Sequence, residues 1–217
     1  MQDSVDSKEP LSRREREHEA HRQEILKVAE AVFSVNGFDG TTIEMVAKQA
    51  DFSVGSIYNF FKGKEDLFRQ VFLQVAEQRI AGINNATASL LDRPWDALRA
   101  LIDVGIKYYV GHGEFLRTAF SAVTSGGSRA LKNAAPPPEF LRAFRGYFLA
   151  LQTVIAAVLK APEARPFSVN DGILIFEGVC REYLLAHARN HETGLPQPLP
   201  ADAAEEMYEF LCRIYRK

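Results

Sequence analysis

The stretch AVFSVNGFDGTTIEMVAKQADFSVGSIYNFFKGKEDL, residues 31–67, decides the fold. The Asn-Gly pair at 36–37 is predicted to end a helix, because glycine adopts the left-handed C-terminal conformation without steric cost. Thr41 and Glu44 have the spacing of a capping box and open a second, short helix, and Ser53 can cap a third. Two short helices joined by a tight turn, with a helix on either side, predict a helix-turn-helix headpiece.

Helices are also predicted on both sides of this stretch. Ser12 and Glu15 have capping-box spacing, and the helix that follows has one apolar face made of Ile25, Leu26, Ala29, Val32 and Phe33. Lys64 begins a longer amphipathic helix with an apolar face of Leu67, Phe68, Val71, Phe72 and Val75. Residues 1–11 show no periodicity and are expected to form a mobile arm. The headpiece is therefore expected to span residues 12–63.

The remainder, residues 64–217, is predicted to be a second helical domain. Further helices are expected over Trp95–Val110, Glu114–Thr124, Pro138–Lys160, Ser168–Asn190 and Asp202–Arg216. Capping-box spacing or its acidic variant marks two of the starts, Ser168 with Asp171 and Asp202 with Glu205. Because no alternating strand pattern persists, the fold class is all-α.

Composition excludes several classes of protein. In 217 residues no apolar run reaches the roughly 18 residues that a membrane span needs, and residues 1–11 are polar, so we expect a cytoplasmic protein with no membrane partner. The net charge is -2, and residues 1–67 hold nine Lys/Arg against thirteen Asp/Glu. DNA binding therefore cannot be argued from overall charge. Cys180 and Cys212 lie among apolar neighbours and are expected to be core thiols.

The sequence carries no pattern typical of an enzyme. It has no nucleophile–base pair, phosphate loop or cofactor motif, so no catalytic residue and no cofactor is expected. His187 and His191 have the i, i+4 spacing of a metal pair, but no acidic or cysteine partner accompanies them. No metal site is expected.

The headpiece resembles the DNA-binding domain of the TetR family of regulators. The matching positions are Phe33, Gly37, Phe38, Thr42, Ile43, Ala47, Ala50, Ser53, Gly55, Tyr58, Phe60, Phe61, Lys64, Glu65 and Leu67. The resemblance implies a homodimer that binds double-stranded operator DNA with the headpieces and a small-molecule effector with the second domain. The predicted function is a DNA-binding transcriptional regulator, a repressor released by a mostly apolar or aromatic ligand.

The candidate DNA-binding residues lie in and around the third helix. They are Thr41, Thr42, Ser53, Val54, Gly55, Ser56, Tyr58, Asn59, Lys62 and Lys64. Gly55 lets the helix approach the groove closely, and the short polar groups can bond phosphates or base edges. As the resemblance implies, the hydroxyl of Tyr58 reaches a phosphate. Asp51 stands where the family's turn more often has glycine, which is tolerable because aspartate visits positive φ.

Other interpretations of these residues stay open. A tyrosine beside paired phenylalanines is commonly a core-edge aromatic. Arg13, Arg14 and Arg16 could add positive charge to the DNA interface, but they alternate with acidic residues and also fit a solvated helix face. Val54 occupies a position where a polar or basic residue is frequent in the family, so we expect direct base contacts either to be few or to include a thymine methyl.

An excess of aromatic residues predicts an apolar pocket with polar tips in the second domain. The candidate ligand-binding residues are Tyr108, Tyr109, Phe115, Phe120, Phe140, Phe144 and Phe148. Aromatic stripes at helical spacing are usually core, so a core position is the alternative for each of these residues. Tyr147 lies in the same run, and Arg117 and Arg142 leave room for a ligand carboxylate.

The last two helices resemble the family's dimerisation helices. The candidate dimerisation residues are Phe176, Val179, Tyr183, Phe210 and Ile214, and a two-fold dimer would read a palindromic operator. The alternative is a helical small-molecule or lipid-binding protein without DNA-regulatory activity. An activator would have the same sequence features as a repressor.

Overall fold

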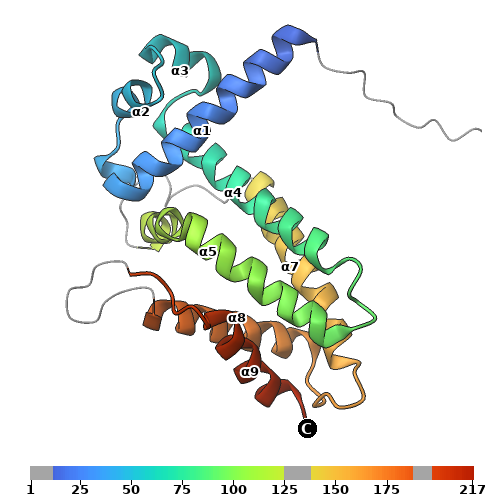
Figure 1. The fold of residues 1–217 in the computed structure, drawn as a ribbon. Coiled ribbons are helices and arrows are strands. Elements are labelled where there is room, and N and C mark those ends of the chain that lie inside the picture. The colour runs from blue at the N-terminus through green and yellow to red at the C-terminus, as the bar shows by residue number, and fades with distance from the viewer. Residues whose placement is uncertain (1–11, 125–137, 188–196) are drawn as a thin grey trace, which may run out of the picture. The chain divides into compact units, whose positions relative to one another are not determined.

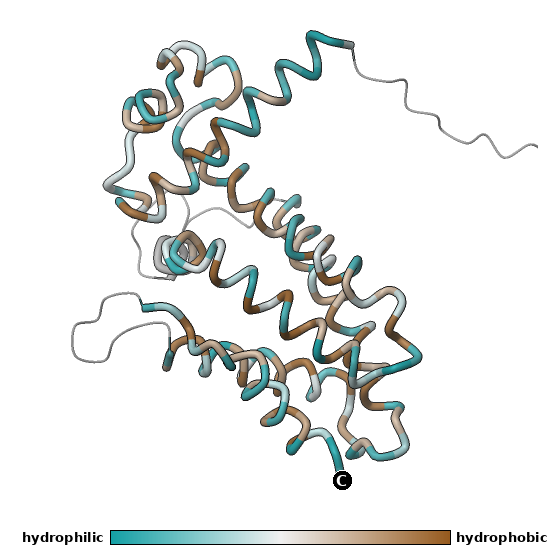
Figure 2. Tube along the Cα trace, in the orientation of Figure 1, coloured by the Kyte–Doolittle hydropathy of each residue, from teal (hydrophilic) through white to brown (hydrophobic). Residues whose placement is uncertain are grey.

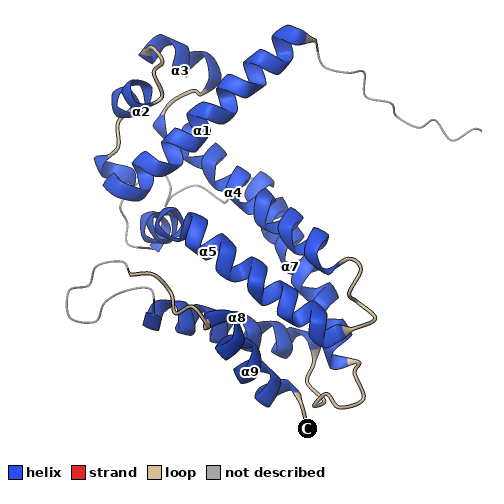
Figure 3. Cartoon of the chain, in the orientation of Figure 1, coloured by secondary structure: helices blue, strands red, loops and turns tan. Residues whose placement is uncertain are grey.

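The computed structural model describes residues 12–124, 138–187 and 197–217, and within the helix that ends at Thr124 it describes side chains up to Ala119. These ranges hold eight helices and no strand beyond one isolated bridge between Ala164 and Arg216 (Figure 3). The all-α prediction is confirmed.

The chain divides into two compact units. The first holds the described residues up to Phe72 together with the end of a long helix from Glu114, and the second holds Leu73–Gly113 and the described residues from Pro138 onward. The boundary expected from the sequence, at residue 63, falls before α4 (Lys64–Thr87), which continues from the first unit into the second.

The first unit contains α1 (Arg13–Gly40), α2 (Ile43–Gln49), α3 (Val54–Phe60) and the start of α4 (Figure 1). Gly37, at φ +70°, interrupts α1 where the Asn-Gly pair predicted a helix end. Four aromatic rings fill the centre of the unit, with centroids 4.9 to 6.2 Å apart along the cluster, and they are Phe33, Phe38, Phe68 and Phe115.

The second unit is built from the rest of α4 with α5 (Pro94–Thr124), α7 (Pro138–Leu159), α8 (Val169–His187) and α9 (Ala203–Tyr215). Its core includes Leu98, Leu151, Ile155, Phe176 and Leu211. α8 approaches α7 so closely that a Cβ at Gly172 would lie 2.7 Å from Ile155 Cγ2. Tyr215 donates a hydrogen bond from its hydroxyl to the Gly172 carbonyl at 2.6 Å and so ties α9 to α8.

Two sequence expectations about these helices are wrong. The helices expected over Trp95–Val110 and Glu114–Thr124 form one continuous helix, α5. Its internal glycines cost helix stability but impose no break, and a Cβ at Gly113 would lie 3.2 Å from the Tyr109 ring, which packs over the bare backbone. Asp202 precedes α9 but makes no capping hydrogen bond, whereas Ser168 accepts the predicted bond from the Asp171 N–H at 3.1 Å.

α7 is the one helix within the described ranges that is long and apolar enough to cross a membrane by length and composition. The helix is not an uninterrupted apolar run, because it contains Glu139, Arg142 and Arg145. Ala150, Leu151, Val154, Ile155 and Val158 of α7 all lie in the core of the second unit. Core helices pass the same test, so the match is weak evidence for a membrane span.

Candidate nucleic-acid interface

Hydroxyl caps and a strained turn position fix α2 and α3 locally. Thr42 accepts a hydrogen bond from the Met45 N–H at 3.3 Å, and Ser53 accepts one from the Ser56 N–H at 3.0 Å. Each cap satisfies a backbone donor that a helix start would otherwise leave unpaired. Between the helices Asp51 has φ 59°, so the aspartate adopts the positive φ expected at this turn.

The structure corrects the predicted role of Thr41. The sequence placed Thr41 at the cap of the second helix, but the cap is Thr42, one residue later. Thr41 is 1% exposed and donates its hydroxyl hydrogen bond to the Gly37 carbonyl at 2.7 Å, which satisfies a group at the end of α1. A side chain buried in this way does not reach DNA, so Thr41 leaves the candidate set.

α3 fully buries one residue and exposes Gly55, Tyr58 and Asn59. Ile57 is fully buried, whereas Tyr58 is 54% exposed and Asn59 is exposed too. Neither Tyr58 nor Asn59 makes a side-chain hydrogen bond to any other described residue. Around Gly55, a Cβ would meet only Ser53 Oγ at 3.8 Å, so the chain's own packing does not require a glycine there. Val54 and Ser56 are half-buried at the edge of this face.

The two candidate lysines after α3 differ in how they are held. Lys64 donates to the Asp39 carbonyl at 3.4 Å, and its Nζ lies 4.7 Å from the centroid of the Phe38 ring. Lys62 is exposed, and only its backbone N–H is engaged, in a bond to Asp66 Oδ2 at 2.9 Å. Lys62 therefore has the freer ammonium group of the two.

Two histidines of α1 hold the residues that flank α3, a feature the sequence reasoning missed. The His18 ring lies 4.4 Å from the Phe60 ring, and the His21 ring lies 5.4 Å from the Phe52 ring. Their i, i+3 spacing was the available signal, since such residues share one face of a helix. α3 is thus held from both of its ends by α1.

Comparison of the sequence with known proteins identifies similar DNA-binding proteins. The sequence profile of bacterial regulatory proteins of the TetR family matches residues 25–71. The HTH-type transcriptional repressor NicS of Pseudomonas putida is 34% identical over 147 residues, which span 66% of this chain and 64% of NicS. Residues 25–71 are a DNA-binding domain of the TetR family. Because the match covers less than two thirds of NicS, it does not by itself transfer the whole protein's activity.

Solved structures share the fold of the chain as a whole. A bacterial regulatory protein in the TetR family from Rhodococcus RHA1 aligns with a TM-score of 0.67 at 20% identity, covering 89% of this chain and 96% of that one. A transcriptional regulator from Aquifex aeolicus VF5 aligns with a TM-score of 0.62 at 18% identity, covering 88% and 97%. At these identities the likeness concerns the fold alone.

The predicted ligand-binding residues fall into different surroundings. Tyr108, Tyr109 and Phe140 are half-buried in the second unit, while Phe144 and Phe148 are 53% and 45% exposed on α7. Phe115 is fully buried in the first unit against Phe68. The side chain of Phe120 lies outside the described part of the structure. Arg117 is paired with Glu114 at 2.8 Å, and Arg142 is exposed.

A polar cluster in the second unit was not predicted. The guanidinium carbon of Arg79 lies 4.1 Å from the Tyr147 ring centroid and 5.0 Å from that of Tyr108. Its Nη2 lies 3.9 Å from Glu177 Oε1, which also accepts the hydroxyl hydrogen bond of Tyr147. Burial raises the pKa of Tyr147, and the neighbouring Glu177 adds to the rise although Arg79 opposes it. Burial also raises the pKa of Cys180 to about 12, so its thiol stays protonated.

The predicted dimerisation residues lie on α8 and α9. Val179, Tyr183 and Phe210 line a groove of about 340 Å³ that is almost entirely apolar. Phe176 is buried in the core of the second unit, and Ile214 is half-buried.

Beside this groove, His187 Nδ1 lies 2.8 Å from the Tyr183 carbonyl oxygen, and His191 is outside the described residues. Cys180 and Cys212 are free thiols.

Proposed function

We propose that the chain is a sequence-specific DNA-binding transcriptional regulator. The observation that carries the proposal is the surface of α3, where Tyr58 and Asn59 are exposed without a partner among the described residues and Gly55 leaves open space beside them. If Tyr58 were a core-edge aromatic residue, other side chains would cover its ring. Gly55 has room for a side chain, so a binding role for the surface of α3 explains the glycine better than packing does. The TetR-family match of residues 25–71 supports the same function.

In this proposal each group of the interface has its own task. The backbone N–H groups and hydroxyls at the starts of α2 and α3, with Thr42 and Ser53, face phosphates. The hydroxyl of Tyr58 and the ammonium of Lys62 add phosphate contacts that fix the position of the headpiece. Asn59 and Ser56 face base edges, and Val54 can contact a thymine methyl. Such a regulator works in the cytoplasm, where bacterial DNA is.

The proposed assembly is a homodimer on a palindromic operator. The apolar groove of α8 and α9 offers a self-complementary surface for a second copy, and an isologous interface gives a two-fold dimer. Two recognition helices then enter successive major grooves only if they lie about 34–36 Å apart. Analytical ultracentrifugation of a Phe210→Glu variant should show a monomer that no longer binds the operator tightly. An intact dimer would move the interface elsewhere.

The effector is proposed to be a small molecule that binds in the second unit and releases the repressor from DNA. Tyr108, Tyr109 and Phe140 supply apolar surface, and Arg79 beside Tyr108 supplies a polar end to the site. Binding there would act on α4, which runs through both units. Repression itself is tested with a reporter under the gene's own promoter. Deleting the gene should raise output, and an unchanged or lower output would reject repression.

DNA binding is tested first, with purified full-length protein and a fragment from immediately upstream of its own gene. Tight binding that survives excess nonspecific DNA at physiological salt is the expected result. A Tyr58→Phe variant should bind roughly tenfold more weakly on every sequence, because it loses one hydrogen bond to a charged acceptor. Its matched control, Tyr109→Phe in the second unit, should bind like the wild type. Binding lost equally to any competitor would reopen the small-molecule or lipid-binding alternative.

A further inference from the structure

The first part of α1 is a helix that buries almost nothing. From Ser12 to Glu24 every residue is exposed except the half-buried Arg22, and the first buried residue is Ile25. Figure 2 shows hydrophilic residues dominating this part of the helix. A short helical segment without an apolar face is marginal in water, so its stability has to come from local bonds and from anchoring.

Both sources of stability are visible. Ser12 and Glu15 form a complete capping box, with the Ser12 N–H donating to Glu15 at 2.8 Å. Anchoring comes from the rings of His18 and His21 against Phe60 and Phe52 at the ends of α3. Arg22 donates to Gln70 Oε1 at 2.8 Å as a further tie, to α4. The exposed segment is therefore fixed beside the candidate recognition helix.

The arginines of this segment are not equivalent. Arg13 is paired with Glu17 at 2.8 Å, Arg22 is held by Gln70 and lies 3.6 Å from Glu19, and Arg16 also has an interaction. Arg14 makes no ion pair or hydrogen bond through its side chain with any other described residue, and it is exposed. One arginine of the set is thus unused by the fold.

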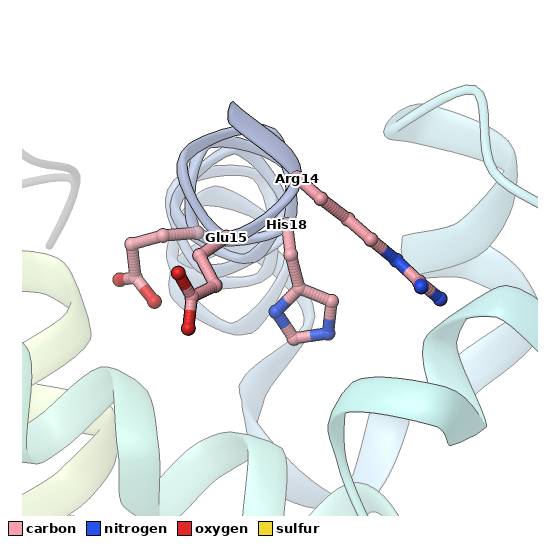
Figure 4. Close-up of a pocket in the computed structure, with 4 residues that line it drawn as sticks. Arg14, Glu15 and His18 are labelled. Carbon is pink, nitrogen blue, oxygen red and sulfur yellow. The ribbon is translucent and has the colours of Figure 1, made fainter. Parts of the chain in front are cut away.

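The acidic neighbours of Arg14 are already engaged. The bonds with Ser12 lower the pKa of Glu15, and Glu19 accepts a hydrogen bond from Gln23 at 2.6 Å. In Figure 4 the side chains of Arg14 and Glu15 diverge from α1, and His18 points away from the helix between them. These residues and Glu19 line an open hollow of about 460 Å³. The guanidinium of Arg14 lies beside these carboxylates but forms no ion pair with them among the described residues.

We propose that Arg14 is a phosphate-binding residue of the DNA interface. It precedes His18 by one helical turn on the same face, and His18 packs on Phe60, two residues after Tyr58. Arg14 therefore lies on the face of α1 that packs against α3, the helix that carries Tyr58. A guanidinium presents a planar fork of donors that matches phosphate, and one without an internal partner gives up no ion pair on binding. This inference rests on the proposed DNA binding of the chain.

The test compares Arg14→Ala with Arg13→Ala in the full-length protein on the same operator fragment. Both changes remove one cation from adjacent exposed positions, so overall charge falls equally. A dimer that loses two phosphate contacts should show a salt slope smaller by roughly 1.8. The fall in affinity between about 50 and 200 mM salt is then expected to be about tenfold smaller for Arg14→Ala than for the wild type. Arg13→Ala should keep the wild-type slope, and Arg14→Lys most of it.

The outcomes separate this inference from the proposed function. If the wild type binds its operator and the two alanine variants share one salt slope, Arg14 has no contact of its own and the inference is overturned while DNA binding stands. If the wild type itself shows no specific binding, the proposed function fails first and Arg14 loses its role with it. Thermal unfolding should be unchanged in both variants, and an unfolded Arg14→Ala would show a structural role instead.

Discussion

The two compact units fix their functional side chains by different means. In the first unit the caps of α2 and α3 join residues three positions apart, Thr42 with Met45 and Ser53 with Ser56. In the second unit the polar cluster joins Arg79 of α4 to Glu177 of α8. Local bonds leave a signature in a short window of sequence, whereas a cluster of this kind depends on how distant helices pack. The caps of the first unit can therefore be predicted from sequence, whereas the polar cluster of the second unit cannot.

A pair of matched core substitutions gives the largest expected effect. Ile57 and Ile155 are both fully buried, the first in α3 and the second in the core of the second unit. Replacing either with alanine should lower the free energy of unfolding by about 2–5 kcal/mol in urea denaturation, through lost burial and the cavity left behind. Val35→Ala, at an 84% exposed position, should stay within about 0.5 kcal/mol.

The Ile57→Ala and Ile155→Ala variants also test whether DNA binding depends on the first unit alone. Well below its melting temperature, the Ile155→Ala variant should bind operator DNA like the wild type. Ile57→Ala should lose DNA binding under those conditions, because Ile57 is the one buried anchor of α3. Equal loss of DNA binding in both variants would mean that the units do not divide the work as proposed.

Two tyrosine-to-phenylalanine substitutions compare the loss of a single hydroxyl group in each unit. The Tyr147 hydroxyl donates to Glu177 in the polar cluster, and Tyr147→Phe should cost about 1–2 kcal/mol of unfolding free energy. The Tyr58 hydroxyl has no partner among the described residues, so Tyr58→Phe should leave stability unchanged within about 0.5 kcal/mol and weaken DNA binding. Urea denaturation and operator titration of both variants decide this. A stability loss in Tyr58→Phe would make Tyr58 a structural residue.

Sequence reasoning went far in the first unit because its determinants are local. The helix order, the cap at Ser53 and the positive φ of Asp51 all follow from residues within a few positions of one another. The cap was placed one residue early at Thr41 because two adjacent threonines carry the same signal. In the structure Thr41 is the buried one, and its hydroxyl donates to the Gly37 carbonyl at the end of α1. The i, i+3 spacing of His18 and His21 indicated one shared helix face but not what it contacts, since His18 and Phe60 lie 42 positions apart in the sequence.

In the second unit sequence reasoning found helices but not the site. The sequence predicts that one helix ends at Val110 and the next begins at Glu114, yet Gly111 and Gly113 lie inside one continuous helix, α5. The aromatic residues predicted to share a pocket are divided between the two units, with Phe115 in the first. The sequence did not predict that Arg79 joins the polar cluster, because an arginine on an amphipathic helix usually lies on the solvated face of that helix. Contacts between these aromatic residues depend on how the helices pack, which a short stretch of sequence does not predict.

Asp66 gives the smallest expected effect, and it tests whether the start of α4 is held locally like α2 and α3. Burial would raise the pKa of Asp66, but hydrogen bonds from the Lys62 backbone N–H and from Arg69 outweigh it and hold the pKa below its usual value. A carboxyl whose pKa is lowered by folding stabilises the folded state above its unfolded pKa, about 3.9. That contribution is lost as the pH falls through the lower, folded pKa.

The Asp66→Asn variant should therefore be less stable than the wild type by about 1 kcal/mol at pH 7, since the amide accepts these bonds more weakly than the carboxylate. Urea denaturation at decreasing pH should show the two proteins converging below about pH 4, where the wild-type carboxyl becomes protonated. Glu65→Gln, at the exposed neighbouring position, should change stability by less than about 0.5 kcal/mol at pH 7. A difference between Asp66→Asn and the wild type that persists undiminished at pH 3 would mean that the negative charge is not what holds this turn. The start of α4 would then depend on packing, as the second unit does.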